Sequence, residues 1–362
     1  MNIVHIITTI EFGGAEKQLL ILARAQARLG HKVSVVYLKG MDELKQSFLD
    51  SGIQVIDSLS SRPFVIQIFL LRNVLFSNAY DIWHAHLPRS EVLLALSSCL
   101  MHKSAVLISS KHNAERFIPQ APKFISRTIS RLCSIFFNSH IYISNAVAHF
   151  IRDSREISKR KTSKVIHYAY DETLDLKSPS VHKLDSPLHF LFVGRFEPQK
   201  NLFFLINTFK QFRKTFPKDS LTLVGRGSQE AELKLKSDEG IFFLPRTSEV
   251  ENIYSSYDCL VLPSLYEGFG LVLLEAMAAG IPILCSNVSA MPEVMGNRYM
   301  GTFNPGEESS LIRKLTDLHD PIFFGFLATY CAERIKDFGV DKAALATLRL
   351  YEKAIRSENE SF

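Results

Sequence analysis

The stretch PSLYEGFGLVLLEAMAAGIP, Pro263–Pro282, carries the clearest fold signal in the sequence. A short apolar run, Cys259–Leu262, precedes it, and a helical pattern begins after the glycines near Gly268–Leu271. A strand that is followed by a glycine turn and a helix is typical of a parallel α/β sheet. Glu267 and Glu275 lie within this apolar stretch, and a carboxylate near a core is costly unless it has partners. The stretch therefore predicts either two structurally satisfied acids or a ligand site.

Short apolar runs alternate with helical patterns along most of the chain, which predicts parallel sheets covered by helices. We expect an α/β protein with two Rossmann-like, doubly wound domains facing a cleft. The expected boundaries are residues 1–170 for the first domain, 171–188 for a polar linker and 189–342 for the second domain. A helix within residues 343–362 is expected to pack back onto the first domain. The expected strands are Ile3–Thr8, Val33–Leu38, Ile53–Ile56, Ile82–His84, Val106–Ser109, Ile141–Ile143, Val165–His167, Phe190–Val193, Leu221–Val224, Ile241–Leu244, Cys259–Leu262 and Ile283–Cys285.

Composition narrows the class of protein. A length of 362 residues favours two domains, and a net charge of +5 is too mild to indicate a nucleic-acid partner. Five scattered cysteines without a C-x-x-C pair predict neither a disulfide framework nor a zinc site, as in a reducing cytoplasm. The opening residues MNIVHIITTI have the pattern of a strand, and no apolar stretch is long enough to span a bilayer. We expect a cytoplasmic protein, soluble or bound to the inner face of the cell membrane.

Three glycine turns each follow an expected strand. Gly13 and Gly14 precede a helix, where main-chain N–H groups can approach an anion, although a tight turn alone explains them. Arg195 and Lys200 follow the first strand of the second domain, a pairing that suits a diphosphate unless both are solvated surface cations. The turn at Gly225 can approach a nucleotide base or ribose, or serve helix packing. The G-x-G-x-x-G fingerprint is absent, which disfavours an NAD-dependent dehydrogenase.

The residues of the opening stretch are expected at the edge of the sheet where its strands end, as are the glycine turns. Gly268–Leu271 falls where a helix begins, so its N–H groups form a potential anion site. Glu267 precedes this helix, and Glu275 lies about one turn into it, where it can accept hydrogen bonds from the vicinal hydroxyls of a ribose. Either glutamate alone is more typical of a surface or capped position. Together they favour a ligand that offers hydroxyl donors.

Histidines mark two strand ends of the first domain. His84 and His86 lie in DIWHAHLP, and His112 follows the next strand in SSKHNAER. A metal site at His84 and His86 lacks an acidic or cysteine partner at ligand spacing, and packed histidines are the simpler interpretation. His112 is the better candidate for contacting a sugar or its leaving phosphate.

The motif Glu267-GFGLVLL-Glu275 resembles the E-x7-E signature of the large family of retaining GT-B glycosyltransferases. The segments GGAEKQ, WHAHLP, KHN, VGRFEPQKN and PEV resemble the same family in order, from Gly13 to about Gly296. The resemblance implies transfer of a hexose from a nucleotide-diphosphate sugar, expected to be UDP-linked, with retention and with no cofactor or divalent metal. It implies a glycan or polyprenyl-diphosphate-linked acceptor in surface polysaccharide or lipopolysaccharide synthesis.

The resemblance also implies roles for individual residues. Arg195 and Lys200, with the N–H groups of Gly270 and Leu271, would support the leaving diphosphate. Glu275 would hold the ribose and Glu267 the donor sugar. The other donor-site and sugar contacts implied are Gly14, His86, His112, Gly225, Gly268 and Phe269. VIHYAYD stands where the family commonly has Pro-Asn-Gly, and Arg226 replaces a frequent acid, which leaves the base contact open. A nucleotide-sugar epimerase of the same fold and a non-catalytic nucleotide-sugar-binding protein remain alternatives.

Basic charge is concentrated within one segment. Residues 111–164 contain 11 Lys and Arg against 3 Asp and Glu. PKFISRTISRLCSIFFNSH within it predicts an amphipathic helix. Its apolar face would either pack on the sheet or, with its basic face, lie against an anionic membrane, where Phe117 and Ile118 would reach the headgroups. The apolar face comprises Ile125, Ile129, Leu132 and Phe136, and the basic face Lys123, Arg127 and Arg131.

Overall fold

The computed structural model describes residues 1–99, 105–157, 162–170, 176–245 and 253–360. The chain divides into two compact units, an N-terminal unit of Met1–Ala169 with Val340–Phe362 and a C-terminal unit of Tyr170–Gly339. The described part of the stretch expected as a linker, residues 176–188, belongs to the C-terminal unit. There the N–H of Lys177 donates to the carbonyl of Ala278, and that of Ser180 to Gly280.

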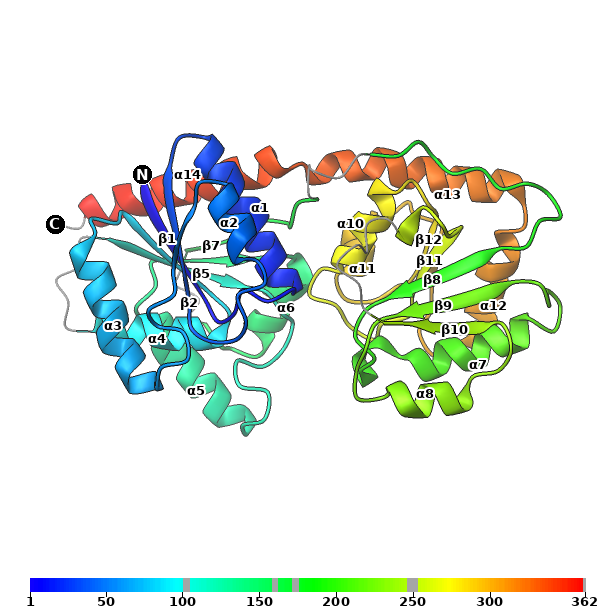
Figure 1. Cartoon of the computed structure of the whole chain (residues 1–362), viewed down its shortest axis with the longest axis horizontal. Helices are drawn as coiled ribbons and strands as arrows, with labels where there is room; N and C mark the ends of the chain where they lie inside the picture. The colour runs from blue at the N-terminus through cyan, green and yellow to red at the C-terminus, as the bar shows by residue number, and fades with distance from the viewer. Residues whose placement is uncertain (100–104, 158–161, 171–175, 246–252, 361–362) are drawn as a thin grey trace. The chain divides into compact units, whose positions relative to one another are not determined.

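A parallel seven-stranded sheet forms the centre of the N-terminal unit, in the order β3-β2-β1-β4-β5-β6-β7 (Figure 1). The order reverses between β1 and β4, so the first and fourth strands are neighbours at the centre. The strands are β1 Asn2–Ile7, β2 Lys32–Tyr37, β3 Gln54–Ile56, β4 Ile82–His86, β5 Val106–Lys111, β6 Ser139–Tyr142 and β7 Thr162–Val165.

Helices cover both faces of this sheet because its strands are apolar on both sides. The helices α3, α4 and α5 share one buried cluster with Val4, Trp83 and Leu107. On the other face α14 packs over Ile3, Ile82 and Ile108 and also contacts α1. The helices are α1 Gly14–Arg28, α2 Lys45–Asp50, α3 Phe64–Ser77, α4 Pro88–Ser98, α5 Lys123–Ser134, α6 Asn145–Asp153 and α14 Val340–Asn359.

The C-terminal unit repeats the design around a parallel sheet in the order β10-β9-β8-β11-β12-β13, which reverses between β8 and β11. Its core is rich in phenylalanine, with Phe190 packed edge-on against Phe209 and Phe212. The strands are β8 His189–Val193, β9 Ser220–Val224, β10 Ile241–Leu244, β11 Cys259–Leu262, β12 Ile283–Ser286 and β13 Thr302–Phe303. The helices are η1 Pro198–Lys200, α7 Leu202–Phe212, α8 Glu230–Lys236, α10 Leu271–Ala278, α11 Met291–Met295, α12 Glu308–Asp317, α13 Pro321–Arg334 and η2 Ile335–Phe338.

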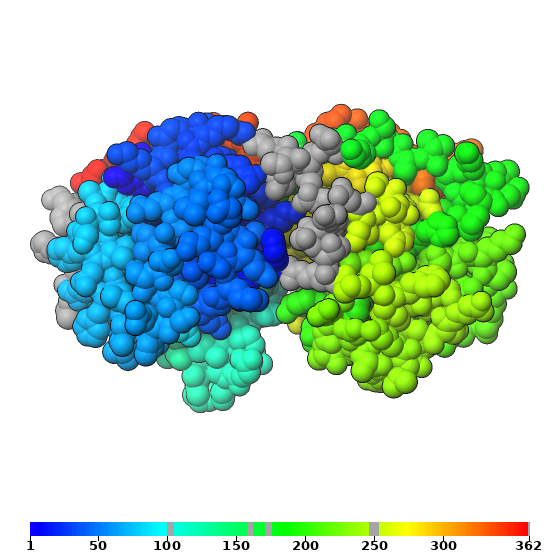
Figure 2. Space-filling view, in the orientation of Figure 1, coloured from blue at the N-terminus to red at the C-terminus, as the bar shows by residue number. Residues whose placement is uncertain are grey.

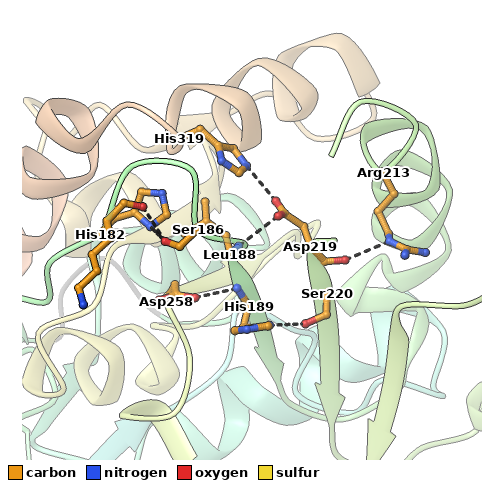
Figure 3. Close-up of polar contacts among 10 residues, drawn as sticks. His182, Ser186, Leu188, His189, Arg213, Asp219, Ser220, Asp258 and His319 are labelled. Carbon is orange, nitrogen blue, oxygen red and sulfur yellow. Dashed lines mark hydrogen bonds and ion pairs between the residues drawn. The ribbon is translucent and has the colours of Figure 1, made fainter. Parts of the chain in front are cut away.

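A polar network holds the starts of β8 and β9 together (Figure 3). Asp219 accepts from the Leu188 N–H at 3.1 Å and contacts His319 Nε2 at 2.9 Å. His189 donates from its N–H to Asp258 at 2.7 Å, and its ring contacts Ser220. These contacts lie at the edge of the sheet where the strands begin. The candidate site lies at the opposite edge, where the strands end.

The sheets agree with the expected two-domain α/β fold, with two differences in the strands. The expected strand Val165–His167 lies earlier, at Thr162–Val165, and the two-residue strand β13 had no sequence signal. All five cysteines are free thiols. Of the helices in the described residues, none combines the length and apolar content that crossing a membrane requires.

Candidate functional site

The loops that follow β8 and β11 bring the predicted acidic and basic residues to one edge of the C-terminal sheet. These strands are neighbours at the reversal of strand order, where open α/β sheets bind ligands. Arg195 follows β8, Lys200 ends the short helix η1, and Glu267 follows β11. The sequence expectation that these loops share one edge therefore agrees with the topology.

Glu267 and Lys200 form a largely buried ion pair. The Lys200 Nζ to Glu267 Oε1 distance is 2.5 Å, with side chains 12% and 8% exposed respectively. Ser264 Oγ donates to the same Oε1 at 2.7 Å. Ser289 Oγ donates to the Glu267 carbonyl at 2.8 Å and accepts from its N–H at 3.3 Å. These partners offset the cost of burying the carboxylate and fix its position.

Glu275 has a different environment from Glu267. It lies in the second turn of α10, is half-buried, and accepts a hydrogen bond from the Tyr254 hydroxyl at 2.8 Å. The two acids of the opening stretch therefore occupy separate positions. One is paired with a cation before the helix, and the other lies within the helix beside a tyrosine.

The turn between the two acids ends in a left-handed glycine. Gly270, with φ of 87°, is the N-cap of α10, and a side chain there would be strained. Gly268 is partly exposed, and Leu271 begins the helix. Phe269 is buried and its ring packs edge-on against Phe338, 5.8 Å between centroids. The Phe269 ring therefore serves the core, and any ligand contact from this residue must come from its main chain.

Arg195 is an exposed cation on the loop after β8. Its guanidinium has no hydrogen bond or ion pair with the residues that the structure describes. The backbone on which it stands is fixed by a close approach of the β8 and β9 turns. A Cβ atom on Gly225, with φ of 152°, would lie 1.9 Å from the Gly194 carbonyl oxygen. The Phe196 N–H donates to the carbonyl of the exposed Arg226 at 2.8 Å.

In the N-terminal unit, Gly14 is the first residue of α1 and is exposed, and Gly13 is its N-cap. Glu16 lies in the first turn of this helix and accepts a hydrogen bond from Thr9 Oγ1 at 2.7 Å. A carboxylate at this turn opposes an anion, so Glu16 weakens the simple electrostatic argument for a phosphate at Gly14.

Four histidines form a buried cluster at the centre of the N-terminal sheet. His5 on β1 contacts His86 on β4, with Nδ1 and Nε2 2.9 Å apart, and His86 Nδ1 lies 3.1 Å from His112 Nε2. His84 contacts the hydroxyls of Tyr351 and Ser110 at 2.6 and 2.8 Å. The sequence had suggested His84, His86 and His112, and the structure adds His5 because β1 and β4 are paired.

Hydrogen-bond direction assigns the tautomers in this cluster. The Gln26 Oε1 lies 2.8 Å from His5 Nε2, so that nitrogen carries the hydrogen. His5 Nδ1 then accepts from His86 Nε2, His86 Nδ1 accepts from His112 Nε2, and His112 Nδ1 accepts from the Tyr168 hydroxyl. In this series of hydrogen bonds the imidazoles of His5, His86 and His112 are each neutral. Both nitrogens of His112 are therefore engaged inside the unit, and a sugar contact requires it to release Tyr168.

Burial has a strong effect on these histidines. It lowers the pKa of His5 to about 4 and that of His112 to about 3, and lowers the pKa of His84 and His86 well below 6.5. The ligand atoms of His5, His84 and His86 lie within 4.8 Å of one another, close enough to share a metal ion. Each of their nitrogens already has a protein partner, so a metal would have to displace these hydrogen bonds.

Several supporting residues were not predicted from the sequence. Ser264, Ser289 and Tyr254 hold the two glutamates, while Gln26 and Tyr168 end the histidine chain. Ser264 lies only three residues before Glu267, and a local hydroxyl before a buried acid could have suggested it. The others come from distant parts of the chain.

Comparison with known proteins follows the division into two units. Residues 12–173 match the family model described as Glycosyltransferase Family 4, and residues 176–320 match Glycosyl transferases group 1. The HepE protein of Anabaena, solved in complex with UDP and glucose, superposes with a TM-score of 0.81 at 19% identity. That superposition covers 98% of this chain and 100% of HepE.

Curated relatives match over shorter spans. Glycogen synthase of Mycobacterium tuberculosis is 32% identical over 48% of this chain and 44% of its own length. The O-antigen chain mannosyltransferase RfbU of Salmonella typhimurium is 28% identical over 52% of this chain and 56% of its own length. The chain thus spans about half the length of these relatives. Each unit matches a different glycosyltransferase family model over most of its length, and the fold is that of GT-B enzymes. The chain therefore belongs to the GT-B glycosyltransferases.

Proposed function

We propose that the chain transfers a hexose from a UDP-sugar, with retention at the anomeric carbon, to a glycan or polyprenyl-diphosphate-linked acceptor. The observation that carries this proposal is the edge after β8 and β11. There a buried Lys200–Glu267 pair, the exposed Arg195 and the start of α10 lie on adjacent loops. Two cations and a helix N-terminus suit a diphosphate, and the two acids suit sugar hydroxyls.

The roles follow from the contacts. Arg195 has a guanidinium available for the diphosphate, and Lys200 reaches the same edge. Glu267 Oε1 is already bonded to Lys200 and Ser264, whereas its Oε2 has no hydrogen bond among the described residues. Oε2 is therefore the atom that we assign to a donor-sugar hydroxyl. Electrostatic support of the departing diphosphate would be the largest catalytic contribution.

The donor and acceptor classes are supported by relatives. HepE was solved with UDP and with UDP-glucose, and O-antigen chain mannosyltransferases of Escherichia coli and Salmonella are among the curated relatives. We extend these properties to this chain and place its work at the inner face of the cell membrane. The contributions of Gly14, His86 and His112 from the N-terminal unit stay predictions.

UDP is expected to raise the melting temperature and to bind in a calorimetric titration, with GDP and CMP as matched controls. Stabilisation by a ligand grows with its concentration over its dissociation constant. Incubation with UDP-hexoses and lipid-extracted acceptors then tests transfer, and the anomeric proton coupling of the product tests retention. Binding of GDP alone would overturn the choice of base, and release of a free epimer would favour the epimerase.

Glu275→Ala is expected to weaken UDP binding by about 5- to 150-fold, because a hydrogen bond to a charged group contributes about 1–3 kcal/mol. Tyr254→Phe removes only the hydroxyl that contacts Glu275, so we expect a smaller loss, of about fivefold. Titration of both variants with UDP measures the effect. An unchanged dissociation constant for Glu275→Ala would remove the ribose role.

A further inference from the structure

Helix α5 turns its apolar side chains outward. Phe124, Leu132 and Ile135, the residue that follows the helix, are 64%, 58% and 62% exposed. The side chains that α5 buries are small ones, Ser126, Ser130, Cys133 and Ser134. The sequence alternative in which the apolar face packs on the sheet therefore holds for half of the four predicted residues, since Ile125 and Leu132 are exposed. Ile129 and Phe136 alone of that predicted face pack against the buried cluster.

The loop before α5 is organised differently from the prediction. Phe117 is buried, and the Lys111 ammonium lies 4.8 Å from its ring centroid. Ile118 packs partly against the same core as α3 and α4. These two side chains therefore anchor the loop, and they are not available to enter a lipid layer.

The outward apolar surface continues onto the neighbouring helices. In α3, Val65, Ile66, Phe69 and Phe76 are exposed, and α4, which packs between α3 and α5, exposes Leu96. All three helices cover the same side of the sheet (Figure 1). We call the surface formed by these exposed side chains and those of α5 the α3–α5 face. Figure 2 shows α5 standing out from the lower edge of the N-terminal unit.

The two sequence spans that contain α3 and α5 carry basic residues and no acidic ones. No Asp or Glu occurs between Asp57 and Asp81, the span that contains α3, or between Glu115 and Asp153, the span that contains α5. Glu91 in α4 is buried and paired with Lys111. The basic residues in these spans include Arg62, Arg72, Lys123, Arg127 and Arg131. Cations beside exposed phenylalanine and leucine, with no surface acid in these two spans, complement an anionic interface that also accepts apolar groups.

We propose that the α3–α5 face docks on the anionic lipid leaflet of a membrane. Exposed apolar patches of this kind mark interaction sites, and the basic residues select a negatively charged surface. A nucleic acid would use the cations and leave Phe69, Phe76 and Phe124 without a role. A lipid-linked acceptor would lie in that leaflet, so docking there would bring the chain to its acceptor. This step rests on the acceptor class given in the proposed function.

Co-sedimentation of the full chain with vesicles tests the proposal. We expect binding to vesicles that carry phosphatidylglycerol, weak binding to phosphatidylcholine alone, and loss at high salt. The triple variant Lys123→Gln, Arg127→Gln, Arg131→Gln should bind anionic vesicles about 100-fold more weakly, because each cation near the surface contributes about fivefold in affinity. Phe124→Ser and Leu132→Ser should each cost roughly tenfold.

Matched controls lie on the C-terminal unit. The triple variant Lys183→Gln, Lys214→Gln, Lys218→Gln removes the same charge from exposed positions, and Leu235→Ser removes an exposed leucine. Both should bind as the unchanged protein does. Equal binding to neutral and anionic vesicles, or a dimer that Leu132→Ser separates in light scattering, would overturn the proposal. UDP titration of every variant separates a failed membrane site from a failed donor site.

Discussion

Lys200→Ala is expected to lower kcat/KM for sugar transfer by about 100- to 1,000-fold, the range for loss of one preorganised charge at a reacting group. The substitution has two effects on the same edge. It removes a cation from the proposed diphosphate site, and it leaves the buried Glu267 carboxylate without its ion partner. An unpaired acid beside a diphosphate repels it, so UDP affinity should fall together with turnover.

The pair makes a double-mutant cycle decisive. Glu267→Gln alone should lower kcat while UDP binding is kept, because Lys200 is then freed for the diphosphate. In Lys200→Ala with Glu267→Gln the repelling charge is gone, so UDP should bind more tightly than to Lys200→Ala alone. Lys210→Ala, which removes an ion-paired lysine on α7, is the control and should leave both quantities unchanged. Independent, multiplicative losses of UDP affinity would contradict a shared site.

Arg195→Ala belongs to the same series and should have a smaller effect than Lys200→Ala. Arg195 is exposed, and its loss leaves no buried acid uncompensated. A reduction of kcat/KM of about tenfold to 100-fold is expected, measured under the same conditions. A loss below about threefold would indicate an ordinary surface cation, since exposed charges contribute little.

The sequence predicted most strands of the sheets because the spacing of apolar residues and the length of apolar runs are local signals. Runs such as Cys259–Leu262 are wholly apolar, as strands buried on both faces must be, and they coincide with observed strands. The two-residue strand β13 is too short to carry such a signal. Local pattern also located α5, yet it could not decide which side faces the core, because small serines can pack against a sheet as closely as large apolar residues.

The partners of the candidate site depend on strand order, which local pattern does not give. Glu267 and Lys200 are 67 residues apart, and they meet because β8 and β11 are neighbours. His5 and His86 are 81 residues apart and meet through the pairing of β1 with β4. Residue type and the family resemblance therefore proposed the acids and cations of the candidate site, while the partners of their charges became known only from the fold.

The second large effect is on stability. Lowering the pH from 7 to 5 is expected to remove about 2 kcal/mol from the free energy of unfolding of the N-terminal unit for each of His5 and His112, with a further loss from His84 and His86. His5 has a folded pKa of about 4 and His112 of about 3, and His84 and His86 are lowered as well, against about 6.5 for an unfolded chain. Below pH 6.5 the unfolded state therefore binds more protons than the folded state, and stability falls as the pH falls.

The loss should begin near pH 6.5 and level off once the folded histidines also bind protons, near pH 4 for His5 and near pH 3 for His112. A histidine that is neutral when folded and protonated when unfolded contributes about 1.4 kcal/mol per pH unit within this window, which is a large share of the 5–15 kcal/mol that stabilises a typical domain. Trp83, the single tryptophan, is buried on β4 in the core under α3, α4 and α5 and reports urea unfolding of this unit by fluorescence. His5→Gln should reduce the pH dependence, whereas His149→Gln, at an exposed position, should leave it unchanged. Equal urea midpoints at pH 7 and pH 5 would mean that these imidazoles are not buried and neutral. That result would also contradict the series of hydrogen bonds that we assign from Gln26 to Tyr168.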